Sequence, residues 1–114
     1  MANKHEEYEL QVKVVKYLRE KGWVVFSIPN ERNLGVADAL RMRKSGLTKG
    51  APDLIAYLPT GLGYGIPYWF ELKTEKGRRS EEQKCMEAVA FDLDVNYKVI
   101  RKLEDLPYYK KEEK

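Results

Sequence analysis

The chain has 114 residues, of which 43% are hydrophobic and 34% charged, and its formal net charge is +3. This length is that of one domain, and the apolar content excludes a disordered tail, so we expect a single folded domain over residues 1–114. One cysteine and one histidine exclude an internal disulfide and a multi-cysteine zinc site. No segment has the roughly 20 apolar residues of a membrane helix, and no signal peptide is apparent, so we expect a cytoplasmic protein.

The N-terminal part predicts a helix followed by a strand. Between residues 6 and 21, apolar side chains recur at helical spacing, at Leu10, Val14, Tyr17 and Leu18. Gly22 ends this helix. The β-rich run 23–28 follows, and its nearly continuous apolar character predicts a strand that is buried on both faces.

A long basic connection follows the first strand. Residues 30–50 contain two acidic residues and five basic ones, Arg32, Arg41, Arg43, Lys44 and Lys49, so the net charge of the segment equals that of the whole chain. We expect a short helix in its middle, over residues 36–44, and turns at Gly46 and Gly50. Connections of this length within one domain usually serve a function.

The next two apolar runs predict a hairpin. Residues 53–58 and 68–73 have the composition of strands, and the glycine-rich stretch 59–65 between them predicts a turn. We therefore expect the two strands to pair with each other.

The C-terminal third predicts a helix and a last strand. Ser80 and Gln83 have the spacing of a capping box, which opens a helix whose apolar face carries Met86, Val89, Ala90 and Leu93. Asn96 is expected to be the left-handed turn residue after this helix. Residues 97–100 predict the last strand, and the charged tail is expected to fray after Pro107. The order αβββαβ indicates an α/β fold with a mixed central sheet flanked by helices.

The residues with the clearest chemical meaning are two acids and a lysine on the predicted hairpin. Glu71 and Lys73 are two apart and share a strand face, and pairing of the strands can bring Asp53 beside Glu71. Two converging carboxylates make an oxygen site suited to Mg²⁺ or Mn²⁺, and a lysine beside it can hold an attacking water.

Each of these residues also has an ordinary structural explanation. Glu71 and Lys73 can be a charge pair on a solvated strand face, and Asp53 can be a turn residue after Pro52. The aromatic run 68–70 argues for a buried strand, however, where ionisable groups are costly unless they are paired or bound to metal.

The ordered set of these segments resembles the VRR-NUC family of virus-type replication-repair nucleases, within the PD-(D/E)xK nuclease superfamily. The segments that carry the resemblance are the first helix with Leu10-Gln11, then 28–31, Gly46, 50–54, 71–73 and 80–83. The resemblance covers nearly the whole chain and implies the restriction-endonuclease-like fold with metal-dependent hydrolysis of DNA phosphodiesters.

The resemblance also implies a role for each site residue. Asp53, Glu71 and the backbone carbonyl of Leu72 would bind Mg²⁺ or Mn²⁺, and Lys73 would act on the water. A glutamate of the first helix would complete the site. We favour Glu7, because it shares helical faces with Leu10 and Gln11, while Glu6 and Glu9 remain alternatives.

Gln83 has two interpretations of similar weight. The family places a glutamine in the helix after the E-x-K strand, where it can reach the site, but Gln83 can instead simply complete the capping box. Phosphate binding is expected from the cations that flank the site in sequence, which are Arg32, Arg41, Arg43, Lys44, Lys49, Lys76, Arg78 and Arg79.

Stand-alone members of the family resemble resolvases of branched DNA, which implies four-way junctions as substrate. Symmetric cutting of a junction needs two sites, so we expect a homodimer, with Tyr64 and Tyr68, or Tyr108 and Tyr109, as candidate interface residues unless they are plain core or surface aromatics. The alternatives are a module that binds branched DNA without cutting it, and a nuclease acting on flaps, ends or RNA. If a virus encodes the chain, its location would be the host cytoplasm.

Overall fold

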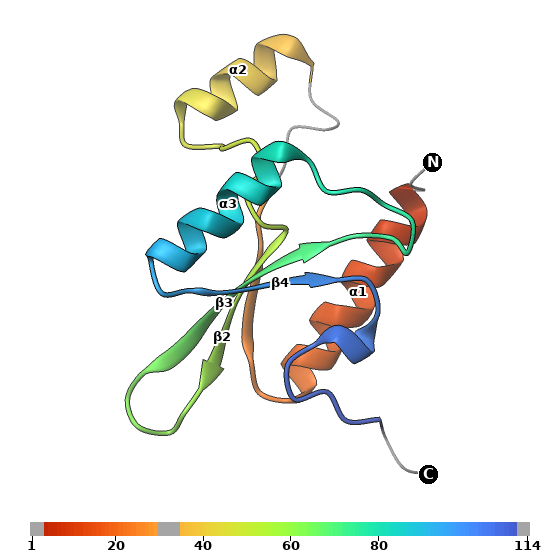
Figure 1. The fold of residues 1–114 in the computed structure, drawn as a ribbon, viewed down its shortest axis with the longest axis vertical. Coiled ribbons are helices and arrows are strands. Elements are labelled where there is room, and N and C mark those ends of the chain that lie inside the picture. Colours follow the sequence, from red (N-terminus) through yellow and green to blue (C-terminus); the bar gives the residue numbers. More distant parts are fainter. Residues whose placement is uncertain (1–3, 30–34, 112–114) are drawn as a thin grey trace.

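Four strands form one mixed sheet with helices on both faces in the computed structural model, which describes residues 4–29 and 35–111 (Figure 1). In chain order the elements are α1 (Lys4–Glu20), β1 (Val24–Ser27), α2 (Val36–Lys44), β2 (Leu54–Pro59), β3 (Gly65–Leu72), α3 (Glu81–Asp92), β4 (Asn96–Ile100) and a 3-10 turn η1 (Leu103–Asp105). The α/β class and the mixed sheet are confirmed. The expected short helix is α2, so the full order is αβαββαβ.

The strands lie in the order β1-β2-β3-β4, with antiparallel pairing except between β3 and β4, which are parallel. Leu54 lies opposite Phe70, and Pro59 lies opposite Gly65 at the turn. The predicted hairpin is thus confirmed. The paired register ends at Leu54 and Phe70, and the N–H of Asp53, one position before it, donates to the carbonyl of the same Phe70.

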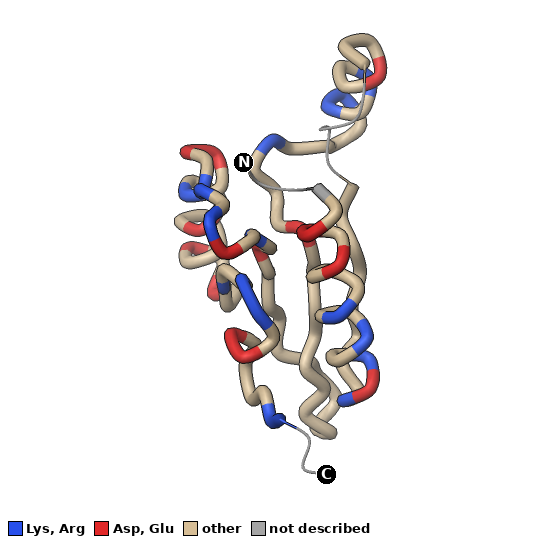
Figure 2. The backbone as a smooth tube through the Cα atoms, turned by 90° about the vertical axis from the view of Figure 1, so that its right-hand side faces the viewer, with Lys and Arg blue, Asp and Glu red and all other residues tan. Residues whose placement is uncertain are grey.

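The sheet separates two helical layers, as Figure 2 shows edge-on, with α1 against one face and α3 against the other. Alternate residues of β3 face α1, and Phe70 and Leu72 are buried there with Val14 and Leu18 of α1. Glu71 and the position of Lys73 belong to the opposite face of the sheet, toward α3, as their spacing predicts.

Helix α3 begins as predicted and ends differently. The Ser80 side chain accepts a hydrogen bond from the Gln83 backbone N–H (3.1 Å), and the Gln83 side chain accepts one from the Ser80 N–H (2.8 Å), so the capping box is confirmed. The left-handed residue after the helix is Asp94 (φ 58°), because Asn96 already belongs to β4. Of the predicted apolar face, Ala90 is buried, but Val89 and Leu93 are 43% and 60% exposed.

Two other expectations are wrong. Strand β1 is not buried on both faces, since Val24 and Phe26 are 47% and 57% exposed; it is an edge strand, and α3 does not extend over it. The tail does not fray directly after Pro107. The Tyr109 ring packs on Tyr17 with 4.9 Å between centroids, and the Lys110 N–H donates to the Tyr17 hydroxyl (3.0 Å).

The four tyrosines considered for a dimer interface differ in how far they are exposed. Tyr68 is 8% exposed and belongs to the core, and Tyr109 packs against that core, whereas Tyr64 and Tyr108 are 63% and 73% exposed. Tyr68 is therefore ruled out as an exposed interface residue.

Among residues 4–29 and 35–111, no helix combines the length and apolarity needed to cross a membrane.

Gly50 is a position where the fold requires glycine. Its φ is +85°, and a Cβ there would lie 2.5 Å from the backbone carbonyl carbon and oxygen of Glu82 in α3. We expect Gly50→Ala to lower the free energy of unfolding by more than Gly46→Ala, measured by urea denaturation. Gly46 has φ +116° with nothing within 4 Å, so its variant loses only about 1–2 kcal/mol for the left-handed backbone. Equal losses in the two variants would contradict the close contact with α3.

Candidate active site

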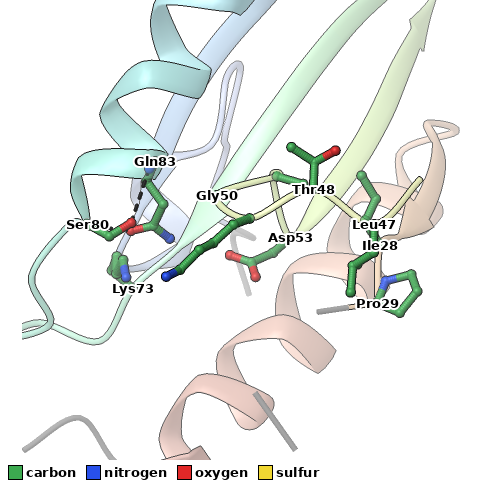
Figure 3. Close-up of a pocket in the computed structure, with 11 residues that line it drawn as sticks. Ile28, Pro29, Leu47, Thr48, Gly50, Asp53, Lys73, Ser80 and Gln83 are labelled. Atoms are coloured by element: carbon green, nitrogen blue, oxygen red, sulfur yellow. Dashed lines mark hydrogen bonds between the residues drawn. The ribbon is translucent and has the colours of Figure 1, made fainter. Parts of the chain in front are cut away.

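A pocket of about 230 Å³ opens where β2 begins, β3 ends and α3 begins (Figure 3). Asp53, Lys73 and Gln83 line it, each from a different one of these elements or its flank. The remaining lining residues are Ile28, Pro29, Leu47, Thr48, Lys49, Gly50, Ala51 and Ser80. Three of the residues predicted for catalysis therefore meet around one cavity.

Asp53 is held in place by its backbone and by one of its carboxylate oxygens. Its N–H donates to the Phe70 carbonyl (3.0 Å), and its carbonyl accepts from the Ile28 N–H (2.9 Å). Its Oδ2 accepts a hydrogen bond from the Leu72 N–H at 2.7 Å. These bonds fix the half-buried Asp53 side chain at the end of the hairpin, where it lines the pocket.

Lys73 continues β3 past its last paired residue. Its backbone N–H donates to the Ile100 carbonyl at 3.0 Å, which fixes its position next to β4. The side chain is half-buried and lines the same pocket as Asp53. An ammonium group in this position can neutralise a phosphate or hold a water molecule.

Gln83 serves the capping box and lines the pocket as well. Its Oε1 is used by the Ser80 N–H, as the structural interpretation predicts, and the residue is 8% exposed. The Nε2 end takes no part in the capping box, so both interpretations of Gln83 are compatible with the structure.

Glu71 does not line this pocket. It is 1% exposed, and the Nε of Arg79 lies 3.1 Å from each of its two carboxylate oxygens. The hydroxyl of Tyr97 donates to Oε1 at 2.6 Å. The carboxylate is therefore directed toward β4 and the residue before α3, and both of its oxygens are engaged.

The charges around Glu71 reinforce this arrangement. Burial and the hydrogen bond to Glu71 both raise the pKa of Tyr97, so its phenol is protonated at neutral pH and can donate. Burial alone would lower the pKa of Arg79, but contacts with Glu87, Tyr97 and Glu71 raise it overall. The guanidinium is thus a permanent positive charge beside a buried carboxylate.

As arranged, the residues do not fit a divalent ion held by Asp53 and Glu71 together. Asp53 is the acidic residue that lines the pocket, and the Glu71 oxygens are occupied by Arg79 and Tyr97. Within residues 4–29 and 35–111, no group of three acidic, histidine or cysteine side chains is placed to hold a metal. The Leu72 carbonyl remains a predicted ligand.

The three candidate glutamates of α1 differ in burial. Glu7 is half-buried, whereas Glu6 and Glu9 are exposed, and Glu9 contacts His5 at 2.8 Å. This difference is consistent with the choice of Glu7 as the one that faces the sheet. Its participation in the site stays a prediction.

The predicted phosphate-binding residues lie in two regions, and Arg32 falls outside the described residues. Arg41, Arg43 and Lys44 are exposed on α2, which extends away from the sheet at the top of Figure 1; Arg41 contacts Asp38. Lys49 lines the pocket and lies 3.4 Å from Glu82. The remaining three follow β3: Lys76 and Arg78 are exposed, whereas the Arg79 side chain is 21% exposed and turned toward Glu71.

Two residues with long-range contacts at the site were missed in the sequence. The sequence indicates for Tyr97 only a place in the last strand, whereas parallel pairing with β3 places it opposite Trp69, on the Glu71 face. Arg101 was not singled out either; its Nη1 donates to the carbonyls of Thr74 (2.8 Å), Glu75 (3.2 Å) and Gly77 (2.8 Å). It thus fixes the segment that follows Lys73. Neither contact has a signal in local spacing.

The fold is similar to that of a solved structure described as a VRR_NUC domain. The two superpose with a TM-score of 0.62 over 87% of each chain, at 19% sequence identity. No family model matches the chain, and no curated protein matches it. The resemblance predicted from the sequence is therefore confirmed at the level of the fold.

Proposed function

We propose that this protein is a nuclease that hydrolyses DNA phosphodiester bonds, that it requires Mg²⁺ or Mn²⁺, and that it acts on branched DNA such as four-way junctions as a homodimer. The observation that supports a nuclease most directly is the pocket containing Asp53, Lys73 and Gln83 within a VRR_NUC-like fold. A carboxylate and an ammonium group around one cavity provide the opposite charges that phosphodiester hydrolysis uses.

The roles that we assign follow from position. Lys73 neutralises charge on the phosphate or orients the attacking water, and Asp53 provides the carboxylate nearest to that water. Gln83 can donate from Nε2 to a phosphate oxygen. The requirement for a divalent cation rests on the fold, and Glu71 could serve such an ion only after exchanging its present partners.

A second candidate is a module that binds branched DNA without cutting it. The engagement of Glu71 by Arg79 and Tyr97 favours this alternative, because it removes one of the two carboxylates expected of the catalytic site. The persistence of Asp53 and Lys73 at one pocket favours the nuclease, since a carboxylate repels the phosphates that a binding module must hold.

A panel of labelled substrates distinguishes these functions. Four-way junction, flap, linear duplex and single-stranded RNA are incubated with the protein in Mn²⁺ or in chelator. We expect cutting of the junction in Mn²⁺ and none in chelator. Binding of DNA without cutting under both conditions would support the binding module. Faster cutting of flaps, ends or RNA than of the junction would replace the proposed substrate. Cutting in chelator would contradict the metal requirement. Light scattering on the same sample tests the homodimer.

The cations of α2 are expected to contribute binding energy and little to catalysis. Arg41→Gln combined with Arg43→Gln should weaken DNA binding and reduce the slope of log K against log salt by about 0.9 for each phosphate that is no longer neutralised. Lys110 and Lys111 belong to the C-terminal segment that follows η1, at the other end of the molecule from α2 (Figure 1), and they provide a control pair. Fluorescence anisotropy at several salt concentrations measures both. If the slope of log K against log salt were unchanged in the α2 variant, α2 would not be part of the DNA interface.

A further inference from the structure

The pocket at the end of the hairpin has one polar side and one apolar side, with Asp53 between them (Figure 3). The polar side consists of Lys73, Ser80 and Gln83. The apolar side, which we call the apolar wall, consists of Ile28, Pro29 and Leu47. The roles proposed for catalysis use Asp53 and the polar side, and they leave the apolar wall without a function.

The apolar wall is not part of the hydrophobic core. The core of the described residues lies between the sheet and α1, and none of the three wall residues belongs to it. Ile28 and Leu47 are half-buried and Pro29 is exposed, so each keeps some apolar surface in contact with water. An apolar group of a ligand that covered this surface would gain free energy from its burial.

Hydrogen bonds hold the apolar wall in position beside Asp53. The Ile28 N–H donates to the Asp53 carbonyl at 2.9 Å, and the Leu47 N–H donates to the Met42 carbonyl of α2 at 2.8 Å. The loop after Leu47 is held at Gly50, whose close approach to α3 leaves no room for a side chain. The wall is thus formed before any ligand binds, so a ligand does not have to order it.

The size and charge of the pocket suit one nucleotide. Its volume of about 230 Å³ is below the roughly 300–1,000 Å³ of pockets for drug-sized ligands. A base pair is about as large as such a ligand, so the pocket can take a single base but not a pair. Its charged lining residues are two lysines, Lys49 and Lys73, and one acid, Asp53, which favours a phosphate. A nucleotide combines a phosphate with an apolar base face, as this pocket combines lysines with the apolar wall.

Resting on the proposed function, we propose that the pocket binds one nucleotide whose base has left the DNA stack. The base packs against the apolar wall, and its phosphate lies toward Lys73. The substrate must therefore present an unpaired base, and unstacking costs least where pairing is already interrupted. Branch points and bulges meet this condition, whereas a continuous duplex does not. The preference for interrupted DNA then arises in the pocket itself.

The test compares two DNA duplexes that differ in a single base. Each has a one-nucleotide bulge, which is a thymine nucleotide in one duplex and an abasic site in the other, so the backbone charge is the same. Fluorescence anisotropy in chelator measures both affinities. We expect the wild type to bind the thymine bulge about fivefold more tightly than the abasic bulge, because the base packs on the wall. Equal affinities would overturn the inference.

Leu47→Ala tests whether this preference arises at the apolar wall, because it removes apolar surface without changing charge. The preference for the thymine bulge should fall to about twofold or less, while the affinity for the abasic bulge stays at the wild-type level. Leu62→Ala is the matched control. Leu62 is 74% exposed and does not line the pocket, so this variant should keep the wild-type preference. Pro29→Ala replaces Leu47→Ala if that variant does not fold.

The outcomes separate this inference from the proposed function. An unchanged preference in Leu47→Ala, or in Pro29→Ala where that variant replaces it, would overturn the inference even if the wild type cuts junction DNA. A wild type that prefers the thymine bulge but cuts no DNA in Mn²⁺ would support the nucleotide site and overturn the nuclease. A wild type that binds neither bulge would overturn both.

Discussion

Replacing Lys73 with alanine is expected to lower the single-turnover cleavage rate by about 10²–10⁴-fold while DNA affinity stays within a few-fold of the wild type. The side chain lines the pocket with Asp53 from the end of β3, where it can act on the reacting phosphate or water. One phosphate contact contributes only a small part of the total DNA affinity, whereas a group acting in the transition state affects the rate directly. Rapid quenching and anisotropy measure the two quantities separately.

Lys76→Ala is the matched control for this variant. Lys76 is three residues further along the chain, exposed, and does not line the pocket. We expect it to weaken binding slightly and to leave the single-turnover rate of the bound DNA unchanged. Equal losses of binding and rate in Lys73→Ala would show that Lys73 only binds DNA.

Replacing Phe70 with alanine is expected to lower the free energy of unfolding by about 3–5 kcal/mol. Phe70 is 0% exposed, and its ring centroid lies 6.2 Å from that of Trp23 and 5.7 Å from that of Tyr68. The loss would consume a large part of the roughly 5–15 kcal/mol that a domain of this kind has available. Urea denaturation followed by circular dichroism measures it.

Phe91→Ala provides the comparison, because the same side chain is removed from a position that is 85% exposed on α3. Its unfolding free energy should stay within about 0.5 kcal/mol of the wild type. If the two variants lost similar stability, Phe91 would have to be covered by a partner, and the assignment of the core to the α1 face of the sheet would be contradicted.

Features set by local spacing could be predicted from the sequence. The β2–β3 hairpin follows from two apolar runs and a glycine-rich turn, and the capping box follows from Ser80 and Gln83 alone. The placement of Asp53 beside the end of β3, where it contacts the backbone of Phe70 and Leu72, follows from that same pairing. Alternation also predicts correctly that Phe70 and Leu72 lie in the core and that Glu71 lies on the other face.

The partners of Glu71 could not be predicted in the same way. Strand alternation determines the face on which a side chain lies but not the direction in which its carboxylate turns. That direction depends on Arg79, eight residues away, and on Tyr97, 26 residues away across a parallel strand pair. The energy of a buried charge selects among such partners only once the tertiary structure brings them together.

The errors concerning β1 and the tail have a related cause. The apolar composition of β1 indicates a buried strand, but α3 covers β3 and β4 and does not extend over β1, so Val24 and Phe26 stay exposed on that face of the sheet. The charged tail contains Leu106 and Tyr109, which pack against the core. In both cases, the position of a distant helix decides the burial.

We infer that DNA is cut in the pocket at the end of the β2–β3 hairpin, and the Asp53→Asn variant tests this inference. Asparagine retains an oxygen that can accept from the Leu72 N–H but removes the charge. In single-turnover assays on junction DNA with Mn²⁺, we expect this variant to bind DNA and to show no cleavage, while Asp92→Asn at the distant end of α3 cuts at the wild-type rate. Wild-type cleavage by a correctly folded Asp53→Asn protein would show that DNA is not cut in this pocket.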